Sequence, residues 1–224
     1  MSTIVTGRYG AVFVPPGIDT LQAFRRWVHF ASLPEKLPIH FLRSDVWLDC
    51  ERADSLANIL LRGELSAVLA TLANADNGLY ATAGMLWSND RAGFATLPDG
   101  FYMSRASLKA KRVWFSNGGN PKAQATEVVG APDIVLEIVS DVSEDKDTNW
   151  AMSAYFDAGI QEYWVFDARD LDDMQFTIFK RGRKEFIAAR ASGGWTKSAV
   201  LGKSFRLTQT EGDDGNPEFT FEYR

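Results

Sequence analysis

The segment from Ala131 to Asp167, APDIVLEIVSDVSEDKDTNWAMSAYFDAGIQEYWVFD, contains two apolar runs that flank a helical pattern. The first run carries Glu137 at its centre, although a carboxylate among buried strand residues is unfavourable unless it is paired or bound to metal. Side chains alternate along a strand, so Asp133 and Glu137 share one face and Leu136 points to the other. We therefore interpret Glu137 as part of a functional site, with an arginine pair as the structural alternative.

A partner carboxylate for Glu137 has to come from another strand. A strand rises about 3.3 Å per residue, so Asp133 lies about 13 Å away and cannot share an ion with Glu137. Asp99, in the apolar run GFATLPDGFYMS, is the best upstream candidate. Magnesium takes oxygen ligands and often uses one or two protein carboxylates beside substrate phosphates. We expect Asp99 and Glu137 to face one another across adjacent strands in an accessible cleft.

The same segment also matches a family pattern in order and spacing. Family members read PD-x-x-x-E-V-x-S, then a helix, then G-x-x-E-Y-W-x-x-D. Those elements fall here on Pro132, Asp133, Glu137, Ser140, Gly159, Glu162, Tyr163, Trp164 and Asp167, and an upstream Pro-Asp falls on Pro98 and Asp99. Over about residues 37–207 the chain resembles the Uma-type restriction endonucleases, a bacterial family with a PD-(D/E)XK nuclease fold.

This resemblance implies a fold, a metal site and a substrate. The fold would be α/β (α+β), with a restriction-endonuclease-like mixed central sheet flanked by helices. Asp99 and Glu137 would bind Mg²⁺ or Mn²⁺, with the backbone carbonyl of Ile138 as a further ligand. The substrate would be DNA, hydrolysed at its phosphodiester bonds, and a homodimer is common among nucleases of this fold.

The lysine that usually assists this chemistry is missing from its common positions. Relatives place it two residues after the acidic residue or on the following helix, and these positions hold Val139 and Ala151. Lys146, beside Asp147 at the start of that helix, is the remaining candidate for orienting the attacking water. A solvated surface pair is the alternative for these two residues. We assign Asp133 and Asp147 to supporting positions behind the catalytic group.

A second departure concerns an early hairpin in which many relatives carry a glutamate. This chain has Phe41 there, and Asp49 and Glu51 are imperfect substitutes. Together with the missing lysines, this favours one alternative function, a catalytically silent nuclease fold that binds DNA or protein. A second alternative is a nuclease restricted to RNA or to branched or single-stranded DNA.

Four cations gather on a predicted hairpin tip, at Lys180, Arg181, Arg183 and Lys184. A basic ribbon of this kind can follow a phosphate backbone and make binding depend on salt, or it can be an ordinary exposed turn. The chain has 24 Lys and Arg against 29 Asp and Glu, a formal charge of −5, which argues against indiscriminate coating of nucleic acid. A local basic groove remains compatible with that charge.

Composition indicates one domain with short ends. The 224 residues are 46% hydrophobic and include 15 Phe and 7 Trp, enough to bury a substantial core. We expect an N-terminal extension with a short helix at residues 1–36, a nuclease domain at 37–207 and a C-terminal tail or strand at 208–224. The single cysteine excludes an internal disulfide, and no Cys/His cluster has zinc spacing.

The same composition predicts a cytoplasmic protein without membrane contact. No basic N-terminal region precedes an apolar core, and no apolar run approaches the roughly 20 residues that span a bilayer. Hydrophobic periodicity predicts the remaining elements. They are a helix after Asp19 or Thr20, two strands around Ser44-Asp45, a helix after Asp54 or Ser55 with a stripe from Leu56 to Leu72, strands at Leu79 to Leu86 and Gly93 to Met103, and helices at Ser104 to Lys111 and Asp147 to Ala158.

Overall fold

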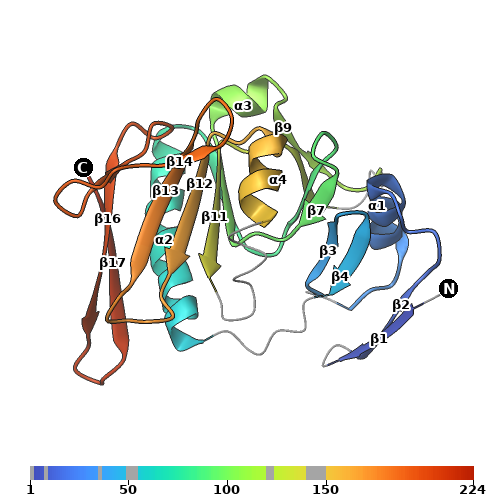
Figure 1. Cartoon of the computed structure of the whole chain (residues 1–224), viewed down its shortest axis with the longest axis horizontal. Coiled ribbons are helices and arrows are strands. Elements are labelled where there is room, and N and C mark those ends of the chain that lie inside the picture. Colours follow the sequence, from blue (N-terminus) through green and yellow to red (C-terminus); the bar gives the residue numbers. More distant parts are fainter. Residues whose placement is uncertain (1–2, 8–9, 35–36, 49–54, 120–123, 140–149) are drawn as a thin grey trace.

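A mixed six-stranded sheet forms the centre of the molecule, as the sequence predicts (Figure 1). The computed structural model describes residues 3–7, 10–34, 37–48, 55–119, 124–139 and 150–224. In the sheet, β11 and β12 are parallel, and all other neighbours are antiparallel. Its order is β14 (Phe186–Ala188), β13 (Gln175–Arg181), β12 (Glu162–Asp167), β11 (Ile134–Val139), β8 (Gly100–Met103) and β5 (Leu79–Thr82).

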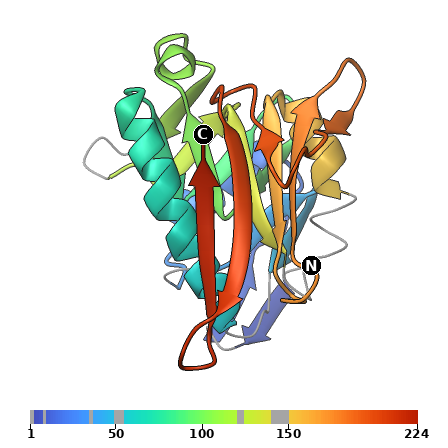
Figure 2. The same cartoon turned by 90° about the vertical axis from the view of Figure 1, so that its left-hand side faces the viewer.

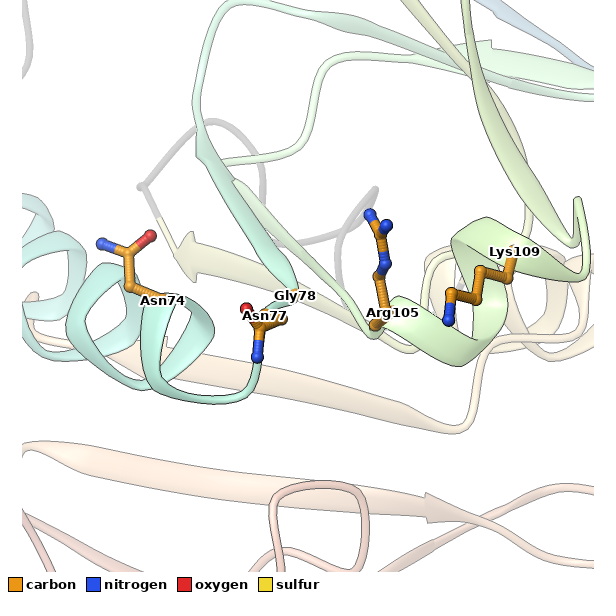
Figure 3. Close-up of a pocket in the computed structure, with 5 residues that line it drawn as sticks. All are labelled: Asn74, Asn77, Gly78, Arg105 and Lys109. Carbon is orange, nitrogen blue, oxygen red and sulfur yellow. The ribbon is translucent and has the colours of Figure 1, made fainter.

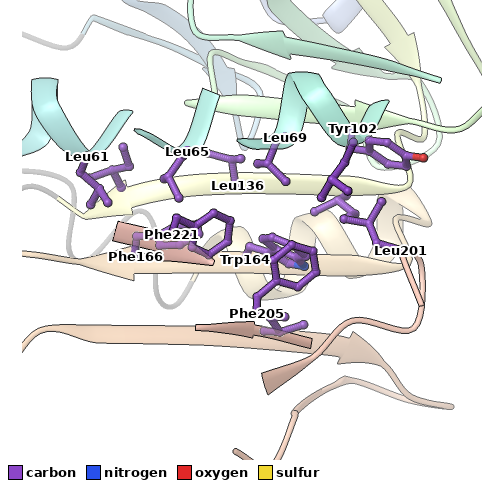
Figure 4. Close-up of a cluster of buried hydrophobic side chains, with 14 of the residues drawn as sticks. Leu61, Leu65, Leu69, Tyr102, Leu136, Trp164, Phe166, Leu201, Phe205 and Phe221 are labelled. Atoms are coloured by element: carbon purple, nitrogen blue, oxygen red, sulfur yellow. The ribbon is translucent and has the colours of Figure 1, made fainter. Parts of the chain in front are cut away.

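One face of this sheet is covered by α2 (Leu56–Ala75) and by the last strands of the chain (Figure 2). These strands are β15 (Thr196–Lys197), β16 (Ser204–Glu211) and β17 (Pro217–Tyr223). Leu61, Leu65 and Leu69 of α2 pack with β11 and β12 residues and with aromatic rings from β16 and β17 (Figure 4). β16 spans residue 207, where the C-terminal boundary is expected. The final hairpin is packed into the same core as α2.

The other face of the sheet carries α4 (Ala151–Ala158) and packs against a second six-stranded sheet. Trp87 and Phe94 from the second sheet contact Tyr155 of α4, with ring centroids 4.8 and 5.8 Å apart. The second sheet has the order β4 (Asp45–Leu48), β3 (Ile39–Leu42), β7 (Phe94–Thr96), β6 (Leu86–Asn89), β10 (Glu127–Gly130) and β9 (Val113–Ser116). Outside it lie α1 (Leu21–Phe30), the hairpin of β1 (Thr3–Gly7) and β2 (Gly10–Val14), and α3 (Arg105–Lys109).

The alternation predicted for β11 is confirmed. Ile134, Leu136 and Ile138 join the core on the α2 side, whereas Val135 joins the core on the α4 side. The helix starts are also as expected, because Thr20 caps α1, Ser55 caps α2 and Ser104 caps α3 through their side-chain oxygens. Gly159 ends α4 with φ +92°, a left-handed conformation that favours glycine.

Two predicted strands are each split between the two sheets. The run from residue 79 to 86 becomes β5 in the central sheet and β6 in the second sheet, and the run from residue 93 to 103 becomes β7 and β8. The breaks fall at Gly84, which has φ +105°, and at Pro98, which has no N–H for a ladder. The four strands thus form one long hairpin shared by both sheets, and Asp99 follows directly after one of its two crossings.

The apolar stripe predicted for α2 is wrong at its N-terminal end. Leu61, Leu65 and Leu69 face the sheet at helical spacing, so Leu56 and Ile59 fall on another side of the helix and are 50% and 52% exposed. By length and composition alone, this 20-residue helix is apolar enough to cross a membrane, contrary to the sequence-based expectation. In the structure, however, one face of α2 is packed on the central sheet.

Candidate functional site

Asp99 and Glu137 lie opposite each other where the ladder between β8 and β11 ends. The last described pair of that ladder is Gly100 with Leu136, so Asp99 and Glu137 come next on the two strands. The backbone N–H of Asp99 donates to Glu137 Oε2 at 3.2 Å, and the N–H of Ile138 donates to Asp99 Oδ2 at 2.8 Å. Each carboxylate is thereby bound to the backbone of the opposite strand, and the two expected site residues come together.

Side chains from the neighbouring strands pack closely over the backbone of Gly100, directly after Asp99. A Cβ at Gly100 would lie 2.7 Å from the Tyr80 hydroxyl oxygen and 3.0 Å from a Leu136 carbon. Both distances are shorter than normal van der Waals contacts. Three consecutive residues therefore have separate roles. Pro98 ends one crossing between the sheets, Asp99 supplies the carboxylate, and Gly100 leaves room for the side chains of Tyr80 and Leu136.

Two further side chains fix the carboxylates. The Tyr155 hydroxyl of α4 donates to Glu137 Oε1 at 2.6 Å, from the α4 side of the sheet. From the α2 side, Arg62 donates to Asp99 Oδ1 through Nη2 at 2.8 Å and through Nε at 3.2 Å. The arginine pair does not seal Asp99, because the side chains of Arg62 and Asp99 remain 24% and 17% exposed. Glu137 is more deeply buried, at 5% exposure.

An open cavity of about 730 Å³ adjoins this pair through Arg62. Its walls come from α1, from the segment that precedes β3 and from both crossings of the long hairpin. The crossings contribute Ala83, Gly84 and Leu97 to these walls, and α1 contributes His29. Because Arg62 both lines this cavity and binds Asp99, it connects the cavity with the carboxylates.

The donor chemistry of the pair fits a hard divalent cation. Two carboxylates offer only oxygen, and Mg²⁺ is commonly bound by one or two carboxylates together with waters and substrate phosphate. No group of three or more His, Cys, Asp or Glu that could hold an ion occurs within the described ranges, so a zinc-type centre is not built there. Asp99 and Glu137 are the residues that would hold such a cation.

The two usual lysine positions are built into the core. Val139 is 2% exposed at the end of β11, and Ala151 is fully buried at the start of α4. Phe41, at the position where the resemblance implies a glutamate, packs against Phe24 with ring centroids 5.4 Å apart. The expected residues Lys146 and Asp147, and the substitutes Asp49 and Glu51, lie outside the described residues.

Asp133 makes its described contacts with α3 and Arg112. Its carboxylate accepts from the Ser104 N–H and the Ser107 hydroxyl, both at 2.7 Å, and is 3.5 Å from an Arg112 nitrogen. These contacts tie the start of α3 to the start of β11, about 13 Å from Glu137 along the strand. None of these contacts reaches Asp99 or Glu137, and the supporting role expected for Asp133 stays a prediction.

The predicted basic hairpin is confirmed, but its four cations differ in their contacts. Arg183 and Lys184 lie exposed in the turn between β13 and β14. Arg181 instead donates to the Phe156 carbonyl near the end of α4, and its guanidinium lies 4.0 Å from the Phe156 ring centroid. Lys180 is half-buried in β13. Of the four, the two turn residues are therefore the exposed ones.

A second cavity, of about 530 Å³, lies between the end of α2 and α3 (Figure 3). Asn74 and Asn77 come from the α2 end, and Arg105 and Lys109 come from α3. Asn74 lies twelve positions after Arg62 on the same helix, which is about 18 Å at 1.5 Å per residue. This cavity is thus remote from Asp99 and Glu137.

Glu127 forms a buried charged cluster beside the open cavity. It is fully buried in β10 and accepts from Arg25 at 2.6 and 3.0 Å and from Ser88 at 2.5 Å, with His29 Nε2 at 2.9 Å. Burial on its own raises the pKa of Glu127, but the hydrogen bonds from His29, Arg25 and Ser88 outweigh it and lower the pKa to about 2. The ionised carboxylate thereby fastens α1 to the second sheet.

Sequence reasoning missed Arg62 and Tyr155. One signal for Arg62 was present, since Arg62 and Glu64 are the only charged residues of α2. Both make contacts outside the helix, because Glu64 accepts the N–H of Phe221 in β17 at 2.9 Å. A charge retained in such an apolar helix indicates a specific partner. Tyr155 gave no comparable signal within its aromatic surroundings.

Comparisons with known proteins show the family and the fold of the chain. The family model Uma2, described as "Putative restriction endonuclease", matches residues 53–209. Among solved structures, a "putative nuclease" from Anabaena variabilis ATCC 29413 has a TM-score of 0.57 at 13% sequence identity, covering 82% of this chain and 90% of that one. At this identity the likeness establishes the fold alone. No curated protein matches the chain.

Proposed function

The chain belongs to the Uma2 family described as "Putative restriction endonuclease", and from this premise we propose that it is an endonuclease that hydrolyses DNA phosphodiester bonds with Mg²⁺ or Mn²⁺. The observation that carries the proposal is the meeting of Asp99 and Glu137 at the end of one ladder, with Arg62 between Asp99 and an open cavity. A purely structural salt bridge to Arg62 would need only one carboxylate, whereas here two carboxylates from separate strands lie together.

The residues of the site have separate parts in this proposal. A bound cation would polarise the scissile phosphate and lower the pKa of an attacking water. Asp99 and Glu137 hold the cation, and the Ile138 carbonyl is the proposed further ligand. The Ile138 N–H and the Tyr155 hydroxyl fix the two carboxylates in advance, which reduces the reorganisation needed at the moment of reaction. Lys146 is proposed to orient the water.

Cleavage of DNA in the presence and absence of metal tests the proposal. Purified protein is expected to nick plasmid DNA with Mg²⁺ or Mn²⁺ and to stop when a chelator is added. Asp99→Asn should reduce the rate by about 10²–10³-fold, because it removes one anionic ligand while keeping an acceptor for Ile138. A matched panel of duplex, single-stranded and branched DNA and of RNA identifies the substrate class. Equal cleavage by the variant and wild type would refute the assigned site.

A silent nuclease fold is the second candidate function. It is favoured by one observation, the burial of Val139 and Ala151 where relatives supply an ammonium group. Such a module would bind DNA or protein without cutting. Protein that binds DNA and Mn²⁺ but cuts none of the panel substrates would support this candidate over the endonuclease.

The hairpin provides an independent prediction about DNA binding. Replacing Arg183 and Lys184 together by alanine should weaken DNA binding and reduce its salt slope by about 0.9 for each phosphate that is no longer neutralised. The melting temperature should not change, because both side chains are exposed. Arg181→Ala should instead lower the melting temperature, since Arg181 binds the end of α4. Fluorescence anisotropy at several salt concentrations measures the first effect, and an unchanged slope would assign the turn to an ordinary surface.

A further inference from the structure

Arg62 combines three properties that no other described residue of the site has together. Its guanidinium is bound to Asp99 Oδ1, it lines the open cavity, and its side chain is 24% exposed. Its helix is firmly anchored, because the neighbouring Leu61 and Leu65 are fully buried. The backbone position of Arg62 is therefore fixed, while its long side chain can reach either Asp99 or the cavity.

The site also needs a positive charge from the protein. Hydrolysis of a phosphodiester builds negative charge on the phosphate oxygens, and arginine binds such oxygens through paired N–H groups. The end of β11 and the start of α4 provide no such charge at Val139 and Ala151, which are apolar and buried. Arg62 supplies a positive charge directly at the carboxylate pair, with Nη2 at 2.8 Å from Asp99 Oδ1.

We propose that Arg62 is the phosphate-binding residue of this site, and that its guanidinium exchanges Asp99 for a DNA phosphate oxygen when a divalent cation binds to Asp99. The proposal rests on the proposed endonuclease function. In this proposal the positive charge of the site comes from Arg62 on α2, because Val139 on β11 and Ala151 on α4 are uncharged.

Simple electrostatics explains why the exchange should occur. A guanidinium and a divalent cation that share one carboxylate repel each other, and the repulsion is strong where water is partly excluded. A phosphate in the cavity offers the guanidinium a new anionic partner. The cation and Arg62 thus compete for Asp99 while both attract the substrate.

This competition gives Arg62→Ala effects of opposite sign. Affinity for Mn²⁺ alone should stay equal or rise, because a competing positive charge has been removed. Affinity for duplex DNA in Ca²⁺, a cation that also prefers oxygen ligands, should fall at least about tenfold, as expected for the loss of one charged hydrogen bond. Single-turnover cleavage should fall by about 10²–10³-fold. Arg62→Lys should recover part of the DNA affinity. Calorimetry measures the Mn²⁺ affinity, and anisotropy measures the DNA affinity.

The control is Arg206→Ala, which removes a comparable guanidinium from Glu222 on the final hairpin, where Nη2 and Oε2 are 2.6 Å apart. All three readouts should equal those of the wild type. A parallel loss of Mn²⁺ affinity and cleavage in Arg62→Ala would mean that Arg62 only positions Asp99, and this would overturn the proposal. The proposal would also be overturned if Arg62→Ala bound DNA as tightly as the wild type, provided that the wild type binds Mn²⁺ and cleaves DNA. A wild type that binds no Mn²⁺ would instead refute the proposed function, and this inference with it.

Discussion

Glu137→Gln is expected to abolish metal-dependent cleavage while the protein stays folded. Glutamine keeps an oxygen that can accept from Tyr155 but removes the negative charge from the carboxylate pair. Loss of a preorganised charged group at the reacting centre lowers rates by about 10²–10³-fold, and loss of a cation ligand adds to this. The melting temperature should stay near the wild-type value or rise, because removing a charge from a residue that is only 5% exposed offsets the loss of the 3.2 Å hydrogen bond from the Asp99 N–H. Single-turnover cleavage and calorimetric titration with Mn²⁺ measure the two losses.

Glu162→Gln is the matched control for this experiment. Glu162 is also a buried carboxylate, on the adjacent strand β12, but it accepts from Ser198 at 2.7 Å, from the Ala199 N–H at 2.6 Å and from Trp164 at 3.0 Å. Its substitution should lower the melting temperature and leave Mn²⁺ affinity unchanged. If Glu137→Gln cleaves as fast as the wild type, the metal site lies elsewhere.

Glu127→Gln is expected to produce the largest loss of stability. Removing one partner of a buried charged pair leaves the other without compensation, and such losses are about 3–5 kcal/mol of unfolding free energy. Here Arg25 would keep only the Asp90 carboxylate, 3.5 Å away, as an anionic partner, and the hydrogen bonds of His29 and Ser88 would lose their charged acceptor. Urea denaturation at neutral pH measures the loss. A change below about 1 kcal/mol would show that the cluster contributes little to stability.

The same cluster predicts how stability depends on pH. The pKa of Glu127 is lowered in the folded protein to about 2 from an ordinary value of 4.5. A carboxylate whose pKa is lower in the folded state stabilises the fold fully at pH values above its pKa in the unfolded state. This contribution disappears as the pH falls through its pKa in the folded state. Unfolding free energy should therefore decrease between about pH 4.5 and about pH 2 in the wild type. Glu127→Gln should show a flatter dependence over this range, and an identical dependence in both proteins would exclude Glu127 as the titrating group.

Much of the fold could be predicted from local chemistry. The alternation in β11, the caps at Thr20, Ser55 and Ser104, and the glycine that ends α4 are all determined by residues within one turn or strand. The division of the long hairpin between two sheets was not predicted. It depends on which strands pair at long range. A Pro or Gly in an apolar run indicates a break in the strand but does not indicate which sheet each half joins.

The candidate site was predictable to a similar extent. Asp99 and Glu137 are unusual within apolar runs, and the limited reach of a strand excluded Asp133 as a shared ligand. The actual contacts of Asp133 required α3 to be placed beside β11. Arg62 could not be assigned to Asp99 from sequence, because the pairing depends on the angle at which α2 lies on the sheet.

The long hairpin that both sheets share links the shape of the cavity to the geometry of the carboxylates. Ala83 and Leu97, at its two crossings, are walls of the cavity, and only Pro98 separates Leu97 from Asp99. A rotation of one sheet against the other would bend the hairpin at these crossings and shift Asp99 relative to Glu137. Substitutions that enlarge or narrow the cavity at Leu97 should thus alter the spacing of the carboxylate pair without touching either carboxylate.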